Sequence, residues 1–412
     1  MRIALCNDPA IALAQEWVCQ LDGWFEKHGT TGFDPFDIKA HPLMRRVQRH
    51  KVPRRCATFL CDLYPHASRW LLRIAPTDNP KTHALLALGG LRLFQVTQDE
   101  CWLDKARANL DWLLGHPADG YAGLCWGYPF AVSGQGLDTP AGTPVAVVSA
   151  IAGGAFALAH EVTGEDRHLE SVRSIAKFLL SDLPRLNGPD GTHCFGYTPG
   201  DRRRVHNANL LAAEHLIGAA KRAGMDECLE PALPALAFTL RAQREDGAWP
   251  YGSPAEGDPY EAGLLALVDH HHSGFVLRSL HGIEKLLPGS VPKEALERGF
   301  RFYRTKLIEH SGMPVNEYGR YPVDIHACAE ALLCMSVMSE RFGGCAKLAL
   351  NAMRWPHQFL RDARSSAPWH RRYPMHISRI AFPRWGVAWM FRALAEYLYR
   401  FQKGSGEKSA LG

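Results

Sequence analysis

Hydrophobic positions along the chain fall into two kinds of helical segment that alternate. Segments of the first kind are apolar on every side and rich in small residues, as in AIAGGAFALAH at residues 150–160. Segments of the second kind carry charged residues along one side. A helix that is apolar all round is buried, whereas a helix with one charged side lies at a surface. The pattern therefore predicts an inner set and an outer set of helices.

The two kinds of segment recur with a period of about 60 residues. The apolar segments open near Thr82, Thr143, Asn207, His271, Ile325 and Trp385, and the amphipathic segments cover 101–114, 167–180, 226–241, 292–308 and 344–360. Open two-helix solenoids have shorter repeats, near about 40 residues. We therefore predict an all-α fold, an (α/α)6 toroid (barrel) of about six helical hairpins. It is expected to form a single domain over 1–402, followed by a flexible tail over 403–412.

Aromatic loops separate the outer segments from the inner ones. Four of the loops contain a pair of residues that favours a turn, followed by Trp, Tyr, Phe and Gly. The pairs are Asp119–Gly120, Asp190–Gly191, Asp246–Gly247 and Ser311–Gly312. Thr143 followed by Pro144 predicts a helix N-cap and first helical residue. Because each loop leads into an inner helix, the loops and the N-termini of the inner helices are expected at one end of the structure.

Composition excludes several classes of protein. The chain of 412 residues is 46% hydrophobic with a net charge of +5, so disorder is excluded and no nucleic-acid partner is expected. The longest nearly apolar run, Val145–Ala159, is shorter than the roughly 20 residues of a membrane span. Eleven cysteines without a C-x-x-C pair favour free thiols. With no export signal visible, we expect a cytoplasmic protein without a membrane span.

The loop end collects aromatic and polar residues that suit a sugar-binding cleft. Aromatic faces stack on pyranose rings, and Asp, His, Asn and Arg supply paired hydrogen bonds. The predicted substrate-binding rings are Trp126, Tyr128, Tyr197, Trp249, Tyr321 and Trp385. The predicted catalytic residues are His206, Asn207, Tyr251, Asp269, His272, Asp324, His326 and Arg384.

The first chemistry that fits these residues is removal of the C5 proton of a uronic acid, by a lyase or an epimerase. This reaction needs a group that neutralises the sugar carboxylate and a His or Tyr that moves the proton. Asn207 and Arg384 would hold the carboxylate. His206 or His272, with Tyr251, would move protons.

The second chemistry is glycoside hydrolysis, which needs two carboxylic groups, one protonated and one ionised. Asp269 and Asp324 supply such a pair. In the proton-transfer alternative, Asp324 and His326 would orient the site instead.

These residues also have structural interpretations. Asn207, Asp269 and Asp324 stand where helix N-caps are expected. The run His270–His272 has the composition of a metal site, but consecutive residues at a helix start point in different directions. We therefore expect no metal and, since the chain has neither G-x-G-x-x-G nor a P-loop string, no nucleotide cofactor.

Six motifs occur in order: WGYPF from Trp126, FGYTPGDRRRVHNANLLAAEHL from Phe195, QREDGAWPYG from Gln243, DHHHSGFVLRSL from Asp269, YPVDIHACAEALL from Tyr321 and PRWGVAWMFRAL from Pro383. In these motifs, and from about Gly32 onwards, the chain resembles a family of bacterial proteins associated with capsule, exopolysaccharide and O-antigen biosynthesis. The resemblance implies a likeness to the (α/α)6 toroid enzymes, which include six-hairpin glycosidases, polysaccharide lyases and uronate epimerases. It implies a pathway more than a reaction, with an oligosaccharide or polysaccharide, free or lipid-linked, as the partner.

The family motif D-x-x-H-[ST]-G places its histidine at His272, which favours His272 over His271 without settling the choice. Two further classes stay open, a non-catalytic glycan-binding toroid and a terpene cyclase-like enzyme. The latter rests on Q-x-x-D-G-x-W at 243–249, but neither D-x-D-D nor D-D-x-x-D occurs in the chain. The oligomeric state is left undecided.

Overall fold

The computed structural model describes residues 8–47, 50–134, 137–254 and 262–402. The chain folds as two compact units. Unit 1 comprises residues 1–111, 308–315 and 319–412, and unit 2 comprises 112–307 and 316–318. The predicted tail at 403–412 lies outside the described residues, and the single domain over 1–402 stays a prediction.

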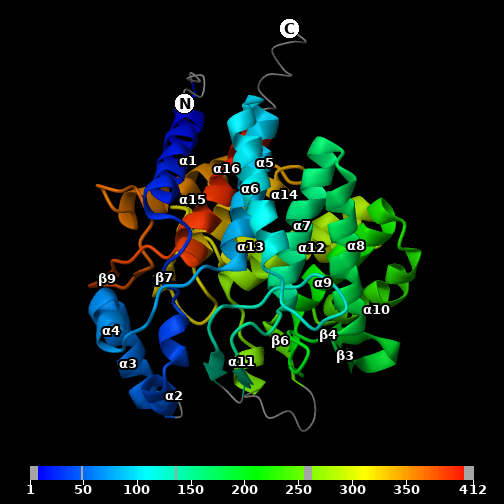
Figure 1. Cartoon of the computed structure of the whole chain (residues 1–412), viewed down its shortest axis with the longest axis horizontal. Helices are drawn as coiled ribbons and strands as arrows, with labels where there is room; N and C mark the ends of the chain where they lie inside the picture. Colours follow the sequence, from blue (N-terminus) through cyan, green and yellow to red (C-terminus); the bar gives the residue numbers. More distant parts are fainter. Residues whose placement is uncertain (1–7, 48–49, 135–136, 255–261, 403–412) are drawn as a thin grey trace. The chain divides into compact units, whose positions relative to one another are not determined.

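Unit 1 is built on a buried helix, α16 (Ala388–Phe401), that packs against α1 (Pro9–His28), α5 (Pro80–Thr97) and α14 (Ile325–Met338) (Figure 1). Its remaining helices are η1 (Asp37–Ala40), α2 (Pro42–Val47), α3 (Lys51–Leu63), α4 (Pro65–Leu71), α6 (Glu100–Gly115, which ends in unit 2), α15 (Cys345–Phe359) and η4 (Pro383–Val387). Its small sheet has the order β7 (Val323–Asp324), β8 (Arg371–Arg372), β9 (Ile377–Ser378).

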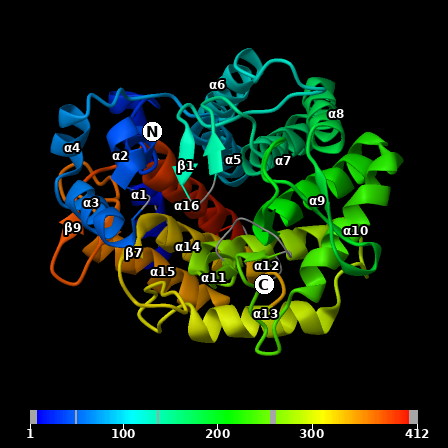
Figure 2. The ribbon, with the colours of Figure 1, turned by 90° about the horizontal axis from the view of Figure 1, so that it is seen from below.

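Unit 2 is built on α9 (His206–Ala223), which packs against α7 (Ala146–Thr163), α8 (Asp166–Ser181), α10 (Leu229–Arg241) and α12 (His270–Leu286) (Figure 2). Its other helices are η2 (Pro189–Gly191), η3 (Asp226–Cys228), α11 (Ala262–Leu265) and α13 (Lys293–Lys306). Three two-stranded ribbons lie in its loops: β1 (Val132–Gly134) with β2 (Leu137–Thr139), β3 (Arg185–Asn187) with β4 (His193–Phe195), and β5 (Arg204–Val205) with β6 (Gly252–Ser253).

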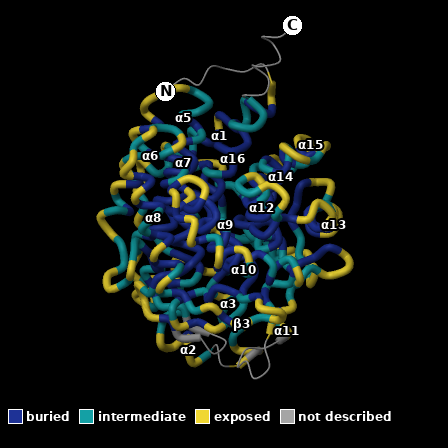
Figure 3. Tube along the Cα trace, turned by 90° about the vertical axis from the view of Figure 1, so that its right-hand side faces the viewer, coloured by how far each residue is buried: buried dark blue, intermediate teal, exposed yellow. Residues whose placement is uncertain are grey.

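The two kinds of helix that the pattern predicts are both present. Helix α9 is buried along nearly its whole length, because Ala, Gly and Leu on every side let neighbouring helices approach closely (Figure 3). Helix α8, by contrast, buries one stripe that includes Leu169, Val172 and Ile175 and leaves charged residues outside. The helices begin within a few residues of the predicted openings.

The predicted N-cap at Thr143 is wrong. Pro144 forms an isolated antiparallel bridge with Gly127, and the Val145 N–H donates to the Trp126 carbonyl. These bonds keep the chain extended, so α7 begins only at Ala146, with Val145 as its N-cap residue.

The four predicted turns are confirmed. Gly120, Gly191, Gly247 and Gly312 have φ of 85°, 72°, 97° and 88°, a region that L residues with a Cβ avoid. Gly312 also packs tightly, because a Cβ there would lie 2.1 Å from the carbonyl carbon of Asn351 in α15. The loops are therefore held directly against the outer helices.

One helix among the described residues, α7, is long and apolar enough to cross a membrane, and 67% of it is buried inside the protein. Burial of this extent is what the core helix of a folded domain shows.

Candidate functional site

Three loops of unit 2 bring a group of half-buried polar side chains to the N-termini of α7, α9 and α12. We call them the tyrosine–histidine cluster: Tyr128, Tyr197, Arg203, Tyr251, Asp269, His271 and His272. The rings of Tyr251 and His272 lie 4.5 Å apart between centroids, and Tyr128 hydrogen-bonds Tyr197. Pairing of β5 with β6, together with the His206 N–H donating to the Tyr251 carbonyl, ties the loop before α9 to the loop before α12.

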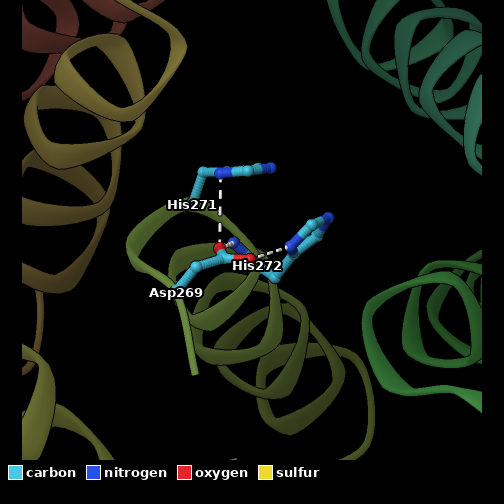
Figure 4. Close-up of side chains that lie close together, drawn as sticks. All are labelled: Asp269, His271 and His272. Carbon is cyan, nitrogen blue, oxygen red and sulfur yellow. Dashed lines mark hydrogen bonds and ion pairs between the residues drawn. The ribbon is translucent and has the colours of Figure 1, made fainter. Parts of the chain in front are cut away.

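Asp269 holds two histidines of the cluster at the start of α12 (Figure 4). One carboxylate oxygen caps the helix by accepting the His272 N–H at 2.9 Å, and the other lies 2.5 Å from His272 Nδ1. His271 Nδ1 lies 3.3 Å from the first oxygen. Because Asp269 engages Nδ1 of His272, that nitrogen carries the proton and Nε2, which points away from the carboxylate, is the basic atom.

Electrostatics keep Asp269 ionised. Burial by itself would raise the pKa of this carboxyl, but the charges of His271 and His272 and the hydrogen bonds from His272 outweigh it, so the net pKa lies below the usual range. A helix N-terminus also favours an anion. Asp269 is thus a fixed negative charge that orients the His272 ring.

The phenols of the cluster are neutral near neutral pH. Burial raises the pKa of Tyr251 to about 12, although the Arg203 charge opposes the shift. Burial and the neighbouring Tyr128 raise the pKa of Tyr197 well above its usual value. The Arg203 guanidinium lies over the Tyr197 ring at 5.6 Å and binds Asp201 through Nε and Nη2 at 2.9 and 2.6 Å. These phenols therefore act as hydrogen-bond donors.

Asp269, His271 and His272 also have the composition of a metal site, since their ligand atoms lie within 4.8 Å of one another. The expectation that consecutive histidines diverge is correct for His270, which is buried against Tyr303 with its pKa lowered by burial to about 3. His271 and His272, by contrast, lie together, with ring centroids 4.0 Å apart. The 2.5 Å separation of His272 Nδ1 and the Asp269 oxygen is that of a direct hydrogen bond.

Three predicted site residues of unit 2 are core residues instead. His206 is fully buried between Thr239 Oγ1 and Ser253 Oγ, and burial lowers its pKa to about 4, so it is a neutral packing residue. Trp126 and Trp249 are 1% and 3% exposed, and their indole N–H groups donate to backbone carbonyls. These tryptophans have no ring face open for stacking on a sugar.

Asn207 is not the predicted N-cap, because α9 already begins at His206 with Val205 as the cap residue. Asn207 is 4% exposed, and its Oδ1 has no hydrogen-bond partner among the described residues. Asp269 and Asp324, in contrast, are N-caps whose carboxylates accept a backbone N–H of the helix they start.

The Q-x-x-D-G-x-W string is a packing device. Gln243 Nε2 donates to the carbonyls of Gly247 and Ala295, which joins the turn to α13. Asp246 Oδ1 accepts the Ala248 N–H, and the Trp249 indole is buried. Each residue of the string has a structural role, so the string lends no support to terpene chemistry.

In unit 1, the carboxylate of Asp324 is saturated. Oδ1 accepts the His326 N–H at 2.9 Å and the Trp385 indole N–H at 2.7 Å, and Oδ2 accepts Arg371 Nε at 2.7 Å. Burial would raise the pKa of Asp324, but the charges of Arg371 and His370 outweigh it and the net pKa is lowered. Asp324 is an ionised structural cap.

Arg384 is also fully engaged in unit 1. It is 2% exposed, and its Nε and Nη2 donate to the two oxygens of buried Asp34 at 2.5 and 2.7 Å. The predicted role of Arg384 as a receptor for a sugar carboxylate is therefore wrong, because Asp34 already neutralises it. The ring of His326 lies against Trp385 and Trp389, at centroid distances of 4.4 and 4.7 Å, and is 2% exposed.

Of the aromatic residues predicted in unit 1, Tyr321 is 38% exposed, whereas Trp385 is 8% exposed and committed to Asp324. Sequence reasoning missed the ion-pairing residues Asp34, Asp62, His370 and Arg371, and Tyr373, whose hydroxyl donates a hydrogen bond to Asp62. The available signal was charged residues embedded among aromatics, in GFDPFD from Gly32 and WHRRYP from Trp369.

No protein-family model and no curated protein sequence matches the chain. Among solved structures, the chain is similar to a GH76 α-mannanase from Bacteroides thetaiotaomicron, with a TM-score of 0.63, 11% identity and coverage of 95% of this chain and 96% of that one. It is similar to a cellobiose 2-epimerase from Bacillus thermoamylovorans, with a TM-score of 0.60, 11% identity and coverage of 78% and 88%. It is also similar to a polysaccharide lyase, with a TM-score of 0.57, 10% identity and coverage of 96% and 99%.

At these identities the likeness shows the fold. The predicted all-α (α/α)6 toroid is thereby confirmed.

Proposed function

We propose that this protein is a carbohydrate-active enzyme that moves a proton at a carbon of its sugar substrate, as an epimerase or a lyase does. The observation that carries the proposal is the short hydrogen bond between Asp269 and His272 Nδ1. It turns His272 Nε2 into a directed base beside the neutral phenol of Tyr251. The solved structures named above include an epimerase, a lyase and a mannanase, which supports a saccharide substrate.

In this mechanism His272 Nε2 removes a proton from a carbon next to a carbonyl or carboxylate group. Asp269 stabilises the imidazolium that forms. The Tyr251 hydroxyl, in contact with the His272 ring, protonates the leaving oxygen in a lyase. In an epimerase it donates a hydrogen bond to the enolate oxygen, and water returns a proton to the opposite face of the carbon. His206 has no part in it, because the ring is buried and neutral.

Two substrate classes fit this chemistry, a uronic-acid saccharide and a neutral sugar in its open-chain form. The pairing of Arg384 with Asp34 removes one support for a uronate carboxylate. In unit 2, the cation beside Tyr251 is Arg203, and it is balanced by Asp201. This charge balance favours the neutral sugar within the proposal.

The hydrolase alternative is weaker on electrostatic grounds. A glycosidase needs one carboxyl group with a raised pKa to act as the acid. Both Asp269 and Asp324 have lowered pKa values and both cap helices. Neither therefore supplies the protonated acid.

The cellular setting stays part of the proposal. Motif resemblance supports a role in surface polysaccharide production on a free or lipid-linked saccharide. The described residues contain ten free cysteines, which supports a reducing cytoplasm.

The experiment is incubation in deuterated water with a panel of neutral reducing sugars and uronic-acid polysaccharides, followed by proton NMR. Deuterium at one sugar carbon without cleavage identifies an epimerase, and ultraviolet absorbance of an unsaturated uronate identifies a lyase. Release of reducing ends without deuterium uptake would identify a hydrolase and refute proton transfer. Silence over the whole panel would favour the glycan-binding toroid.

Variants assign the base. His272→Gln should lower the exchange rate by about 10²–10⁴-fold. His271→Gln should lower it much less, because it leaves the hydrogen bond between Asp269 and His272 Nδ1 in place. Full exchange by folded His272→Gln would remove His272 from the mechanism.

A further inference from the structure

Helix α3 turns an apolar stripe toward solvent. Val52, Phe59 and Leu60 are 71%, 43% and 53% exposed, and Cys56 is exposed as well. Their spacing of three and four residues places them on one side of the helix. A surface helix of a folded domain normally buries such a stripe, so α3 is inverted with respect to the protein core.

The stripe continues into the neighbouring elements of unit 1. In and before α4, Tyr64, Trp70 and Leu71 are 59%, 81% and 73% exposed, and Met375, in the turn between β8 and β9, is 96% exposed. Figures 1 and 2 both show α3, α4 and β9 side by side. A groove of about 820 Å³ lies between them and is lined by residues that include Tyr64 and Met375. We call this surface, with the α3 stripe, the α3–α4 face.

Most of the large hydrophobic side chains that are exposed among the described residues belong to this face. Contiguous exposed apolar surface of this kind marks an interaction site. A partner that covers this face would remove these apolar side chains from water.

The charge around the α3–α4 face is predominantly positive. Residues 42–73 contain eight Lys or Arg and one acid, Asp62. One of the eight, Arg69, is buried and paired with Asp37, so it adds no charge to the surface. Asp62 is buried and accepts the Tyr373 hydroxyl at 2.5 Å, so it does not offset the charge outside. Arg45, Arg46, Arg55 and Arg73 are exposed. The partner is thus apolar and anionic at once.

We propose that the α3–α4 face docks on the anionic lipid surface of a membrane. Amphipathic helices that lie in a membrane interface have an apolar side with Trp, Phe or Leu and flanking arginines that meet lipid phosphates. Trp70 and Tyr64 are the residue types that settle at the headgroup level. Nucleic acid would satisfy the arginines but would leave Val52, Leu60, Leu71 and Met375 in water.

The proposal is independent of the reaction at His272. If the saccharide of the proposed function is the lipid-linked one, docking would also bring the protein to the plane in which that substrate lies.

The test is co-sedimentation of the whole chain with vesicles of phosphatidylcholine alone and of phosphatidylcholine mixed with phosphatidylglycerol. Binding is expected to the mixed vesicles and should weaken as salt screens the arginines. Each basic residue near an anionic membrane contributes about 1 kcal/mol, or about fivefold in partition coefficient. Arg55→Glu with Arg73→Glu, both exposed, should therefore lower partitioning by about 25-fold or more.

Trp70→Ser with Leu71→Ser should lower partitioning by about tenfold or more through loss of apolar contact. Both residues are largely exposed, so the fold should be retained, which circular dichroism checks. Leu233→Ser and Arg301→Glu, exposed positions of unit 2, are the matched controls and should bind as the parent does.

Three results would overturn the proposal. The first is the absence of binding to mixed vesicles, and the second is binding that the Trp70 and Leu71 changes leave intact. The third is evidence that the α3–α4 face binds a partner other than a membrane. Tight binding of duplex DNA without vesicle binding would identify a nucleic-acid surface, and a dimer dissolved by Trp70→Ser with Leu71→Ser would identify a second copy of the chain.

Discussion

The buried ion pair of Arg384 and Asp34 offers a direct test of the interpretation of unit 1. The side chains of Arg384 and Asp34 are 3% and 4% exposed. Two hydrogen bonds of 2.5 and 2.7 Å join them, and Asp34 Oδ1 also accepts the Phe36 N–H at 3.0 Å. Arg384→Met removes the cation and leaves the Asp34 carboxylate buried with a single backbone donor.

The expected cost follows from this geometry. Removing one partner of a buried pair costs about 3–5 kcal/mol. Buried Lys81 interacts electrostatically with both Asp34 and Arg384, so it offsets part of the remaining charge and places the cost toward the lower end. The guanidinium carbon also lies 4.9 Å from the Trp385 ring, a contact that adds about 1 kcal/mol. Asp34→Asn in the Arg384→Met background removes the stranded charge and should recover about 2 kcal/mol or more.

The assay is urea unfolding followed by tryptophan fluorescence, with the two single variants and the double variant completing a cycle. Arg320→Met is the matched control. Its ion pair with Glu309 is largely exposed, at 59% and 32% for the two side chains, so its loss should cost less than about 1 kcal/mol.

Additive effects of the two changes would refute the buried-pair interpretation. A stable, folded Arg384→Met protein whose only defect was a raised KM for an acidic sugar would restore Arg384 as a substrate ligand.

Three further predictions concern stability and thiol reactivity. Burial lowers the folded-state pKa of His206 and of His215 to about 4, so below the ordinary pKa of 6.5 the unfolded state binds more protons than the folded state. The contribution of these histidines to the free energy of unfolding is fully present above pH 6.5 and should fall by roughly 3 kcal/mol per histidine between pH 6.5 and 4. Urea midpoints that stay constant over this range of pH would contradict the prediction. Gly312→Ala should be far more destabilising than Gly120→Ala, because both glycines have positive φ but only Gly312 has backbone atoms within 4 Å of the new Cβ. Equal melting temperatures of the two variants would show that the backbone around Gly312 rearranges to accept the Cβ. After brief thiol labelling of the native protein, mass spectrometry should find the exposed Cys56 and Cys101 modified and Cys194 and Cys328 unmodified. Burial raises the pKa of the Cys194 and Cys328 thiols and so keeps them unreactive. Rapid labelling of Cys194 would show that the structure opens locally around it.

The helices and turns were accessible from the sequence because their causes are local. Alternating apolar and amphipathic segments fix which sides of a helix can meet water, and this pattern predicted the inner and outer helices of both units. Asp-Gly and Ser-Gly pairs predicted four turns, each with a positive-φ glycine, because the backbone preference of these pairs is also local. Thr143 was the exception, because the antiparallel bridge between Pro144 and Gly127 of the same chain overrides the local capping preference.

The candidate site was accessible only in part. The sequence correctly gathered Tyr128, Tyr197, Tyr251 and His272 at the starts of inner helices, because loops that precede those helices share one end. It could not separate exposed side chains from buried ones at the same position in the repeat. His206 and His272 both stand at an inner-helix start, yet one is a neutral core residue and the other faces solvent beside Asp269.

What the sequence determined by itself was therefore the helical periodicity, the turns and the types of side chain near each helix start, because these depend on neighbours along the chain. What only the tertiary structure decided was the partner of each charge. Arg384 meets Asp34, 350 residues away, and Asp324 meets Arg371, 47 residues away. Such contacts depend on how distant segments pack, and packing decides whether an Arg or Asp is a free ligand or one half of a buried pair.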